Sequence, residues 1–238
     1  MGMNQAVSNQ SCSWIESLPL VELGSFPIGI NFRESTKEPL VIHHANPRKL
    51  REEEVLRMSG DLLRVYEEGF LLPKTDDPSL IAQRLDDLAA HIRDAHRVLI
   101  ARDGACPVAF LCSEVLQLSV GKAYHLQGLV CHPSVQGTGL GQRLLEVDVS
   151  QSDAHYMLMH TQSIKMFRLF SRVAVQSEEV AHLLVPQVTD KKLDGLVDRG
   201  RYHGRCLYGD VETFTKFALP GINGAQGDAM FVAGTIKR

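Results

Sequence analysis

The chain has 238 residues, of which 44% are hydrophobic and 22% are charged, and its formal net charge is −3. This length suits one domain with extensions, or at most two small domains. The net negative charge argues against a nucleic-acid partner, and no apolar run approaches the ~20 residues that span a membrane.

The first part of the chain combines an irregular segment with one strand and one helix. Residues 1–39 show no sustained periodicity, and we interpret them as an extension. A short strand is predicted at Leu40–His43. A helical pattern begins near Pro47 and ends at Gly69 or Pro73. The apolar face of this helix carries Val55, Met58, Leu62 and Val65.

A second helix and a hairpin follow. The helix is predicted to begin at Asp76-Asp77-Pro78, where proline favours the first turn. Strands are then predicted at Val98–Ala101 and Val108–Leu118, with a tight turn at Asp103-Gly104 between them. The apolar face of the helix repeats at helical spacing, at Ile81, Leu85, Leu88 and Ile92.

The next strand, Tyr124–Cys131, leads into a glycine-rich stretch. Pro133 ends the strand because it has no N–H to donate to a ladder. Three glycines then occur within residues 136–141. Leu140, Leu144, Leu145 and Val149 repeat at helical spacing, so the glycines are predicted to lie in a strand-to-helix turn.

The remaining elements are shorter. A strand is predicted at Tyr156–His160, and a helix begins near Ile164. Further helices are predicted at Glu178–Leu184 and around Lys191–Val197. A last strand is predicted at Ala229–Ile236.

The glycine-rich turn has a chemical consequence. The first turn of a helix presents unpaired N–H groups and the positive end of the helix dipole. Glycines remove the Cβ atoms that would keep the oxygens of a ligand away from the backbone. The turn therefore suits a phosphate or pyrophosphate, and the alternative is a tight turn that binds no ligand.

Two common phosphate motifs are excluded, because the chain has no G-x-x-x-x-G-K-[ST] and its glycines are too close for G-x-G-x-x-G. The stretch resembles the acetyl-CoA signature of the GNAT N-acetyltransferase superfamily, Q/R-x-x-G-x-G/A, which follows a strand and a bend with proline. Gln136, Gly139 and Gly141 occupy the fixed positions. The order of elements over residues 40–175 is also similar to that of the family.

The resemblance implies an α/β (α+β) fold with a mixed, mainly antiparallel central sheet flanked by helices. It divides the chain into an N-terminal extension (1–39), an acyltransferase core (40–175) and a C-terminal arm (176–238) that completes the sheet and contributes to the acceptor site. The implied activity is direct transfer of an acetyl group from acetyl-CoA to a primary amine. The alternatives are a longer acyl-CoA donor and a catalytically inactive, CoA-binding regulatory domain.

The resemblance also implies how CoA is bound. In the family, the strand before the signature runs beside the pantetheine arm, and its backbone N–H groups contact the thioester carbonyl. Carried over, this places Leu129, Val130 and Cys131 along the arm. The turn that would bind the phosphates consists of Gln136, Gly137, Thr138, Gly139, Leu140 and Gly141.

The acceptor must lose a proton, because an alkylamine with a pKa near ~10.4 is almost fully charged at neutral pH. His125 is the candidate base, and a period of two predicts that it shares a face with Gln127, Leu129 and Cys131. The arylalkylamine branch of the family has H-x-H at two positions of this strand, which here hold His125 and Gln127. The alternative is a histidine that is only packed or hydrogen-bonded.

Other candidate residues have less support. Many family members place a tyrosine as general acid in the helix after the fifth strand, but residues 163–175 contain none, and Tyr202 or Tyr208 could substitute. Cys131 could be a nucleophile, although a small buried thiol is the plainer interpretation. Glu114 could reach the acceptor site, with a surface carboxylate as the alternative.

The five cysteines are odd in number and have no C-x-x-C spacing, which predicts reduced thiols and a cytoplasmic location. His43-His44 and the His91/His96 pair lack a third ligand at suitable spacing, so no metal is expected. The expected partner is a small-molecule or peptide amine. We expect no nucleic-acid partner and no membrane association, and a homodimer is possible.

Overall fold

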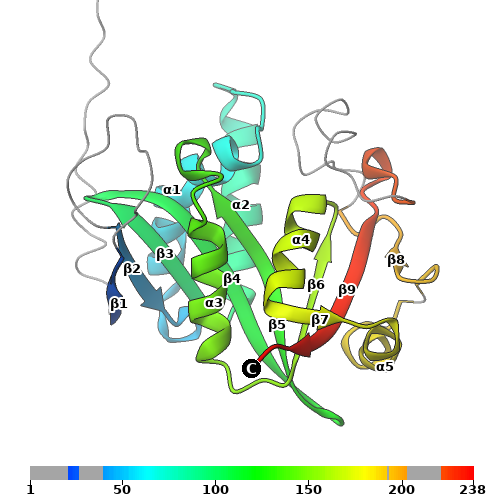
Figure 1. The fold of residues 1–238 in the computed structure, drawn as a ribbon. Helices are drawn as coiled ribbons and strands as arrows, with labels where there is room; N and C mark the ends of the chain where they lie inside the picture. The colour runs from blue at the N-terminus through cyan, green and yellow to red at the C-terminus, as the bar shows by residue number, and fades with distance from the viewer. Residues whose placement is uncertain (1–20, 27–39, 192, 203–220) are drawn as a thin grey trace, which may run out of the picture.

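A computed structural model describes residues 21–26, 40–191, 193–202 and 221–238 of the chain. Its centre is a nine-stranded sheet in the order β1-β2-β3-β4-β5-β6-β9-β7, with β8 paired to β9 (Figure 1). Only β5 and β6 are parallel, and every other pair of neighbours is antiparallel. The predicted mixed, mainly antiparallel sheet with flanking helices is therefore confirmed.

The first half of the sheet is an antiparallel meander. It consists of β1 (Val21–Phe26), β2 (Leu40–Ala45), β3 (Arg97–Asp103), β4 (Cys106–Leu118) and β5 (Gly121–Cys131). The strands predicted from apolar runs are all present, and each extends a few residues beyond its predicted bounds. β1 lies within residues 1–39 and pairs with β2.

Two helices between β2 and β3 cover one face of this meander (Figure 1). These are α1 (Glu52–Gly69), which follows a short 3-10 helix at Pro47–Lys49, and α2 (Pro78–Asp94). The side chain of Asp77 accepts a hydrogen bond from Ser79 N–H and caps α2, and Pro78 occupies the first turn. The apolar faces of both helices are buried against Ile100, Phe110 and Val130 of the sheet.

Two further helices cover the opposite face. α3 (Leu140–Ser150) follows a 3-10 turn at Pro133–Val135, and α4 (Ile164–Val173) follows β6 (Tyr156–Thr161). Leu144, Leu145 and Phe170 pack with Tyr124 and Met157 of the sheet in one apolar cluster. α3 and α4 therefore lie side by side in front of the sheet in Figure 1.

The C-terminal part of the chain returns to the sheet. It contributes β7 (Ala174–Gln176), α5 (Glu178–Val188), β8 (Val197–Asp198), a 3-10 turn at Gly224–Gln226 and β9 (Ala229–Ile236). β9 has the predicted bounds and pairs with β6, β7 and β8. α5 packs with β9 through Leu184 and Phe231 in a third apolar cluster.

The helix predicted around Lys191–Val197 is wrong for the described residues 193–197. Asp194 and Val197 exchange both backbone hydrogen bonds, each 3.0 Å long, and so close a tight turn. Gly195 within that turn has φ +64°, which glycine adopts without a steric penalty. The chain then enters β8 instead of a helix. None of the helices in the described part of the chain combines the length and apolarity that crossing a bilayer requires.

Candidate active site

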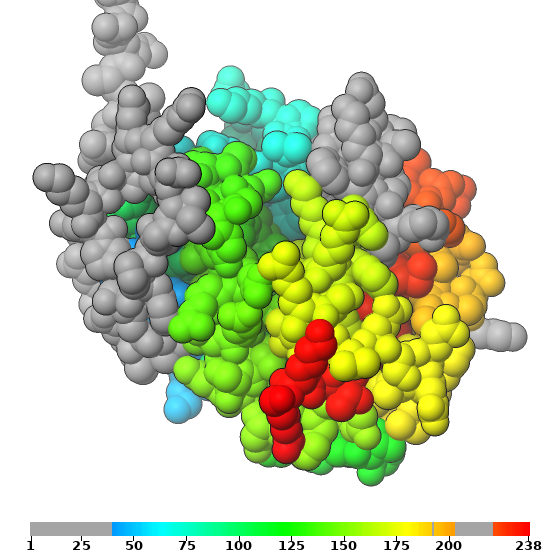
Figure 2. Space-filling model, in the orientation of Figure 1, coloured from blue at the N-terminus to red at the C-terminus, as the bar shows by residue number. Residues whose placement is uncertain are grey.

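A cavity of about 530 Å³ opens where the parallel strands β5 and β6 separate. The registered pairs between these strands end at Leu126 and Met159. Beyond this pair, the end of β5, the glycine turn, the end of β6 and α4 line the cavity, together with the end of α1. Figure 2 shows a hollow between the green segment of the turn and α3 and the yellow-green α4, with cyan atoms of the N-terminal helices behind it.

The glycine turn presents free backbone donors to this cavity. Gly137 and Gly139 have φ values of +80° and +88°, and no atom lies within 4 Å of a Cβ built on either residue. Gly139 is the N-cap of α3 and leaves the helix without a side-chain cap. Among the described residues, no group accepts a hydrogen bond from the N–H of Gly137, Gly139, Gly141 or Gln142. The turn is therefore a cradle of donors that would fit a phosphate.

The third glycine of the turn, Gly141, lies against the end of β5. A Cβ on Gly141 would lie 3.4 Å from Cys131 Sγ and 3.5 Å from Leu129 Cδ2. α3 thus begins close against the end of β5, and this contact fixes the distance between the turn and the strand. Gln136 strengthens the same junction, because its Nε2 donates a hydrogen bond of 2.9 Å to Cys131 O.

The structure brings nearly all of the predicted CoA-binding residues to the cavity. Thr138 is the exception: its hydroxyl donates to Val135 O at 2.8 Å and accepts from Leu140 N–H at 3.4 Å, so it supports the turn itself. The predicted residues that line the cavity are Leu129, Val130, Cys131, Gln136, Gly137, Gly139, Leu140 and Gly141.

Three basic residues of α4 also line the cavity and were missed by the sequence analysis. Lys165, Arg168 and Arg172 lie at i, i+3 and i+7, a helical spacing that places them on one face. Arg172 donates a hydrogen bond to the side chain of Gln142 in the first turn of α3. This stripe could have been found from its spacing, and its positive charge suits an anionic ligand.

A bulge in β5 overturns part of the predicted face. Cys112 pairs with Gly128 and Ser113 pairs with Leu126, so Gln127 is the extra residue of β5. A bulge shifts the alternation of side chains by one position. His125 and Gln127 therefore do share a face, whereas Leu129 and Cys131 point to the opposite one and pack with the cluster under α3 and α4.

His125 and Gln127 are joined through one carboxylate oxygen. Glu114 Oε1 accepts hydrogen bonds from His125 Nδ1 at 2.8 Å and from Gln127 Nε2 at 3.0 Å. A carboxylate can only accept, so Nδ1 carries a proton, and in the neutral imidazole Nε2 is then the nitrogen with the lone pair. Gln127 lines the cavity, whereas His125 does not, and the His125 ring lies 6.3 Å from the ring of His160, which does.

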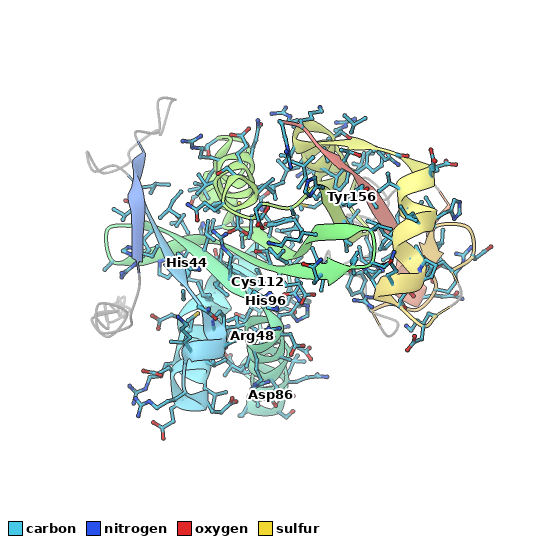
Figure 3. All side chains as sticks on the ribbon, turned by 90° about the horizontal axis from the view of Figure 1, so that it is seen from below. His44, Arg48, Asp86, His96, Cys112 and Tyr156 are labelled. Carbon is cyan, nitrogen blue, oxygen red and sulfur yellow. The ribbon has the colours of Figure 1, made fainter. Side chains whose placement is uncertain are left out.

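Glu114 is not the surface carboxylate that was the alternative prediction, since its side chain is only 16% exposed. Its Oε2 also lies 3.8 Å from Nε2 of His96, which follows α2 (Figure 3). Burial would raise the pKa of Glu114, but the hydrogen bonds from His125 and Gln127 and the nearby His96 hold that pKa below its usual value. Glu114 is therefore an anion that fixes both neighbours of the site.

His160 and Tyr202 also line the cavity, and the sequence did not predict that they lie together. His160 follows Met159 at the end of β6, and Tyr202 belongs to the C-terminal segment. The Tyr202 hydroxyl donates to His160 O at 3.4 Å, and Tyr202 N–H donates to Gly227 O at 2.8 Å. Tyr202 thus lines the cavity, whereas Tyr208, the other tyrosine predicted as a substitute, lies outside the described residues.

Cys131 is unsuited to nucleophilic attack. Burial raises the pKa of its thiol to about 12, so the thiol stays protonated near neutral pH. Within the described ranges, no three His, Cys, Asp or Glu side chains are grouped in a way that could hold a metal ion.

Comparison with known proteins finds a family model that matches part of the chain. Residues 61–168 match the model of the Acetyltransferase (GNAT) family, whereas none of the curated proteins compared with the chain matches it. Solved structures with a similar arrangement include mosquito arylalkylamine N-acetyltransferase like 5b, at 17% identity over 82% of this chain and 99% of that chain, with a TM-score of 0.41.

Two others are an agmatine N-acetyltransferase (13% identity, 82% of this chain and 99% of that chain, TM-score 0.45) and an aminoglycoside acetyltransferase from an uncultured soil metagenomic sample. The latter is 14% identical over 65% of this chain and 92% of that chain, with a TM-score of 0.40.

Proposed function

We propose that the chain is an acetyltransferase of the GNAT family, whose model residues 61–168 match, and that it moves an acetyl group from acetyl-CoA to a primary amine by direct transfer. One observation carries the proposal: unpaired backbone N–H groups of the glycine turn face a cavity that continues into the gap between β5 and β6. Such a site offers donors for phosphates at one end and a strand edge for an extended chain along its length.

The residues of the turn would hold the pyrophosphate of CoA, and Lys165, Arg168 and Arg172 would add positive charge beside it. Bound acetyl-CoA would supply the thioester whose acetyl group is transferred. Beyond Leu126, the edge of β5 that faces β6 has no strand partner among the described residues, and its backbone N–H groups would stabilise charge on the thioester oxygen. Leu129, Val130 and Cys131 form this part of the strand.

His125 is the proposed base. Its Nε2 has a lone pair, and the Glu114 carboxylate at Nδ1 stabilises the cation that forms when the proton arrives. His125 does not itself line the cavity, so a water molecule would carry the proton from the amine to Nε2. This is the proton that leaves the amine as the C–N bond forms and the C–S bond breaks.

Tyr202 is the proposed donor of a proton to the departing thiolate. It lines the cavity from the C-terminal segment, which is outside the residues matched to the family. A thiol with a pKa near ~8.5 leaves readily even without help, so this role is secondary to that of His125. The protonated state of Cys131 supports direct transfer over a route through an acetylated cysteine.

The proposal extends to the organisation of the chain. Residues 40–175 would bind CoA, and residues 176–238 would shape the acceptor side through Tyr202. The role of residues 1–39 as an extension and the location in the cytoplasm stay predictions. A small-molecule or peptide amine is the proposed acceptor.

The test is release of free CoA from acetyl-CoA in the presence of a panel of primary amines, with mass detection of the acetylated amine. Acetyl-CoA is compared with butanoyl- and octanoyl-CoA, so that a preference for a longer donor would appear as a higher kcat/KM. Tight binding of CoA without transfer to any amine would instead indicate a regulatory CoA-binding domain and would contradict the proposed activity.

A further inference from the structure

His160 stands opposite Gln127 at the point where the sheet opens. Leu126 and Met159 are paired, and Gln127 and His160 are the next residues on the two strands. Paired residues of parallel strands point to the same face, so these two side chains emerge together on the face opposite α3 and α4. The ring of His160 accordingly lies 6.3 Å from that of His125 and 5.1 Å from that of Phe231.

Both side chains carry buried polar atoms that lack partners. Nδ1 of His160 and Oε1 of Gln127 make no hydrogen bond within the described part of the chain, and Nε2 of His160 has only Asp198 Oδ2 near it, at 3.4 Å. The His160 side chain is only 8% exposed, and both residues line the cavity. A buried polar atom without a hydrogen-bond partner is energetically unfavourable, because it has lost its bonds to water. Two such residues facing each other across a cavity indicate a ligand that supplies hydrogen-bond donors to both.

The surroundings of His160 keep it neutral. Burial, helped by the positive charges of Arg201 and Lys191 and by His125, lowers its pKa to about 3. Asp198 Oδ2 lies 3.4 Å from Nε2, close enough to orient an Nε2–H tautomer. In that tautomer Nδ1 has a lone pair and can only accept a hydrogen bond.

We propose that His160 binds the amino group of the acceptor, accepting one of its N–H groups while Oε1 of Gln127 accepts the other. This inference rests on the proposed acetyl transfer. A neutral primary amine has two N–H donors and one lone pair. With both donors engaged, the lone pair points towards the acetyl carbon, and the site selects the uncharged form that can attack. The C–N bond then forms and the C–S bond breaks, and CoA leaves as the thiolate. The amine nitrogen, now cationic, releases one of its two protons to a water molecule, which passes it to Nε2 of His125.

The experiment compares full-length variants His160→Phe and His160→Asn with wild type. Phenylalanine keeps the ring contact with Phe231 but removes the acceptor nitrogen, whereas asparagine restores a polar acceptor near the position of Nδ1. His182→Phe, on the exposed surface of α5, is the matched control. Rates are measured with acetyl-CoA and 2-phenylethylamine or n-butylamine, and CoA affinity is measured separately by calorimetry.

We expect His160→Phe to lower kcat/KM for the amine by about 10- to 100-fold, mainly through a higher KM, with the CoA Kd and the shape of the pH–rate profile unchanged. His160→Asn should recover part of the loss, and His182→Phe should match wild type. An unchanged amine KM, or a CoA Kd that weakens in parallel with the rate, would overturn the role of His160.

A readout without turnover separates this inference from the proposed function. In histidine-labelled protein with CoA bound, 2-phenylethylamine should shift the imidazole resonance that is missing in His160→Phe. If no amine is acetylated but this resonance shifts, the activity fails and the amine site stands. If an amine is acetylated but the resonance does not move, the amine site fails and the activity stands.

Discussion

Leu126 and Met159 form the last registered pair between β5 and β6, and the strands diverge immediately beyond them. Gln127, the next residue of β5, is an extra residue relative to β4. Such a bulge bends its strand and increases its twist, so the divergence begins where the bulge lies. The bend opens the cavity and also turns His125 and Gln127 to the face opposite Leu129 and Cys131.

Replacement of Gly139 by Val should abolish CoA binding in a protein that still folds. A β-branched side chain would occupy the space that the phosphate oxygens need, at a φ of +88° that valine rarely adopts. Gly104→Val is the matched control, because Gly104 also has a positive φ (+55°) with open space around its Cβ but does not line the cavity. Calorimetric titration with CoA checks both variants. Normal binding by Gly139→Val would show that the phosphates bind elsewhere.

Replacement of His125 by Ala should lower kcat/KM for the amine by ~10²–10⁴-fold, the usual contribution of positioned proton transfer. The loss should shrink as pH rises towards the pKa of the amine, near ~10.4 for an alkylamine, because the free amine needs no base. CoA affinity should hardly change, since His125 does not line the cavity. A pH–rate profile identical to that of wild type in shape and height would reject His125 as the base.

Replacement of Glu114 by Gln should destabilise the fold in a pH-dependent way. Hydrogen bonds from His125 and Gln127 outweigh burial and lower the pKa of this carboxyl in the folded state. Its contribution is therefore fully present above the unfolded pKa of about 4.3 and is lost as pH falls through the lower folded value.

Urea unfolding of both proteins at about pH 6 and about pH 3.5 measures this effect. The difference in the free energy of unfolding should be larger at the higher pH. An equal difference at both values would mean that the carboxylate charge contributes nothing to the fold.

Replacement of Cys131 by Ala should preserve most of the activity. The thiol, with a pKa raised to about 12 by burial, is protonated at working pH and is not expected to carry the acetyl group. Peptide mass analysis after incubation with acetyl-CoA alone should find Cys131 unmodified, and iodoacetamide should label the exposed Cys106 in preference. Acetyl-Cys131 that disappears on addition of amine would contradict direct transfer.

Much of the fold follows from the sequence because local signals agree with the tertiary structure. The apolar faces of α1 and α3, the Asp77 cap and the strand Ala229–Ile236 are where periodicity predicts them. In α2, Leu88 and Ile92 are buried as predicted, whereas Ile81 and Leu85 are only partly buried. Lys191–Val197 fails because a few apolar positions suggested a helix, whereas Gly195 allows the positive φ of a tight turn. After this turn, Val197 and Asp198 pair with β9 and form the strand β8.

Some features of the candidate site could likewise be predicted from the sequence, and others could not. The glycine turn is readable because it depends on backbone conformation within a few residues. The bulge at Gln127 is not, because it arises from the pairing of β5 with β4 and leaves no local signal. The contacts of Glu114 with His125 and of Asp198 with His160 join distant segments, so periodicity could not predict them.

The most direct test of the central claim is a thermal-shift measurement with CoA. Binding at a concentration of 100 Kd stabilises the folded state by about 2.7 kcal/mol, which for a chain of this size raises Tm by roughly 5–10 °C. We predict this rise for wild type and Gly104→Val, and none for Gly139→Val. A wild-type protein whose Tm does not change at saturating CoA would contradict the assignment of the glycine turn and the β5–β6 gap as an acyl-CoA site.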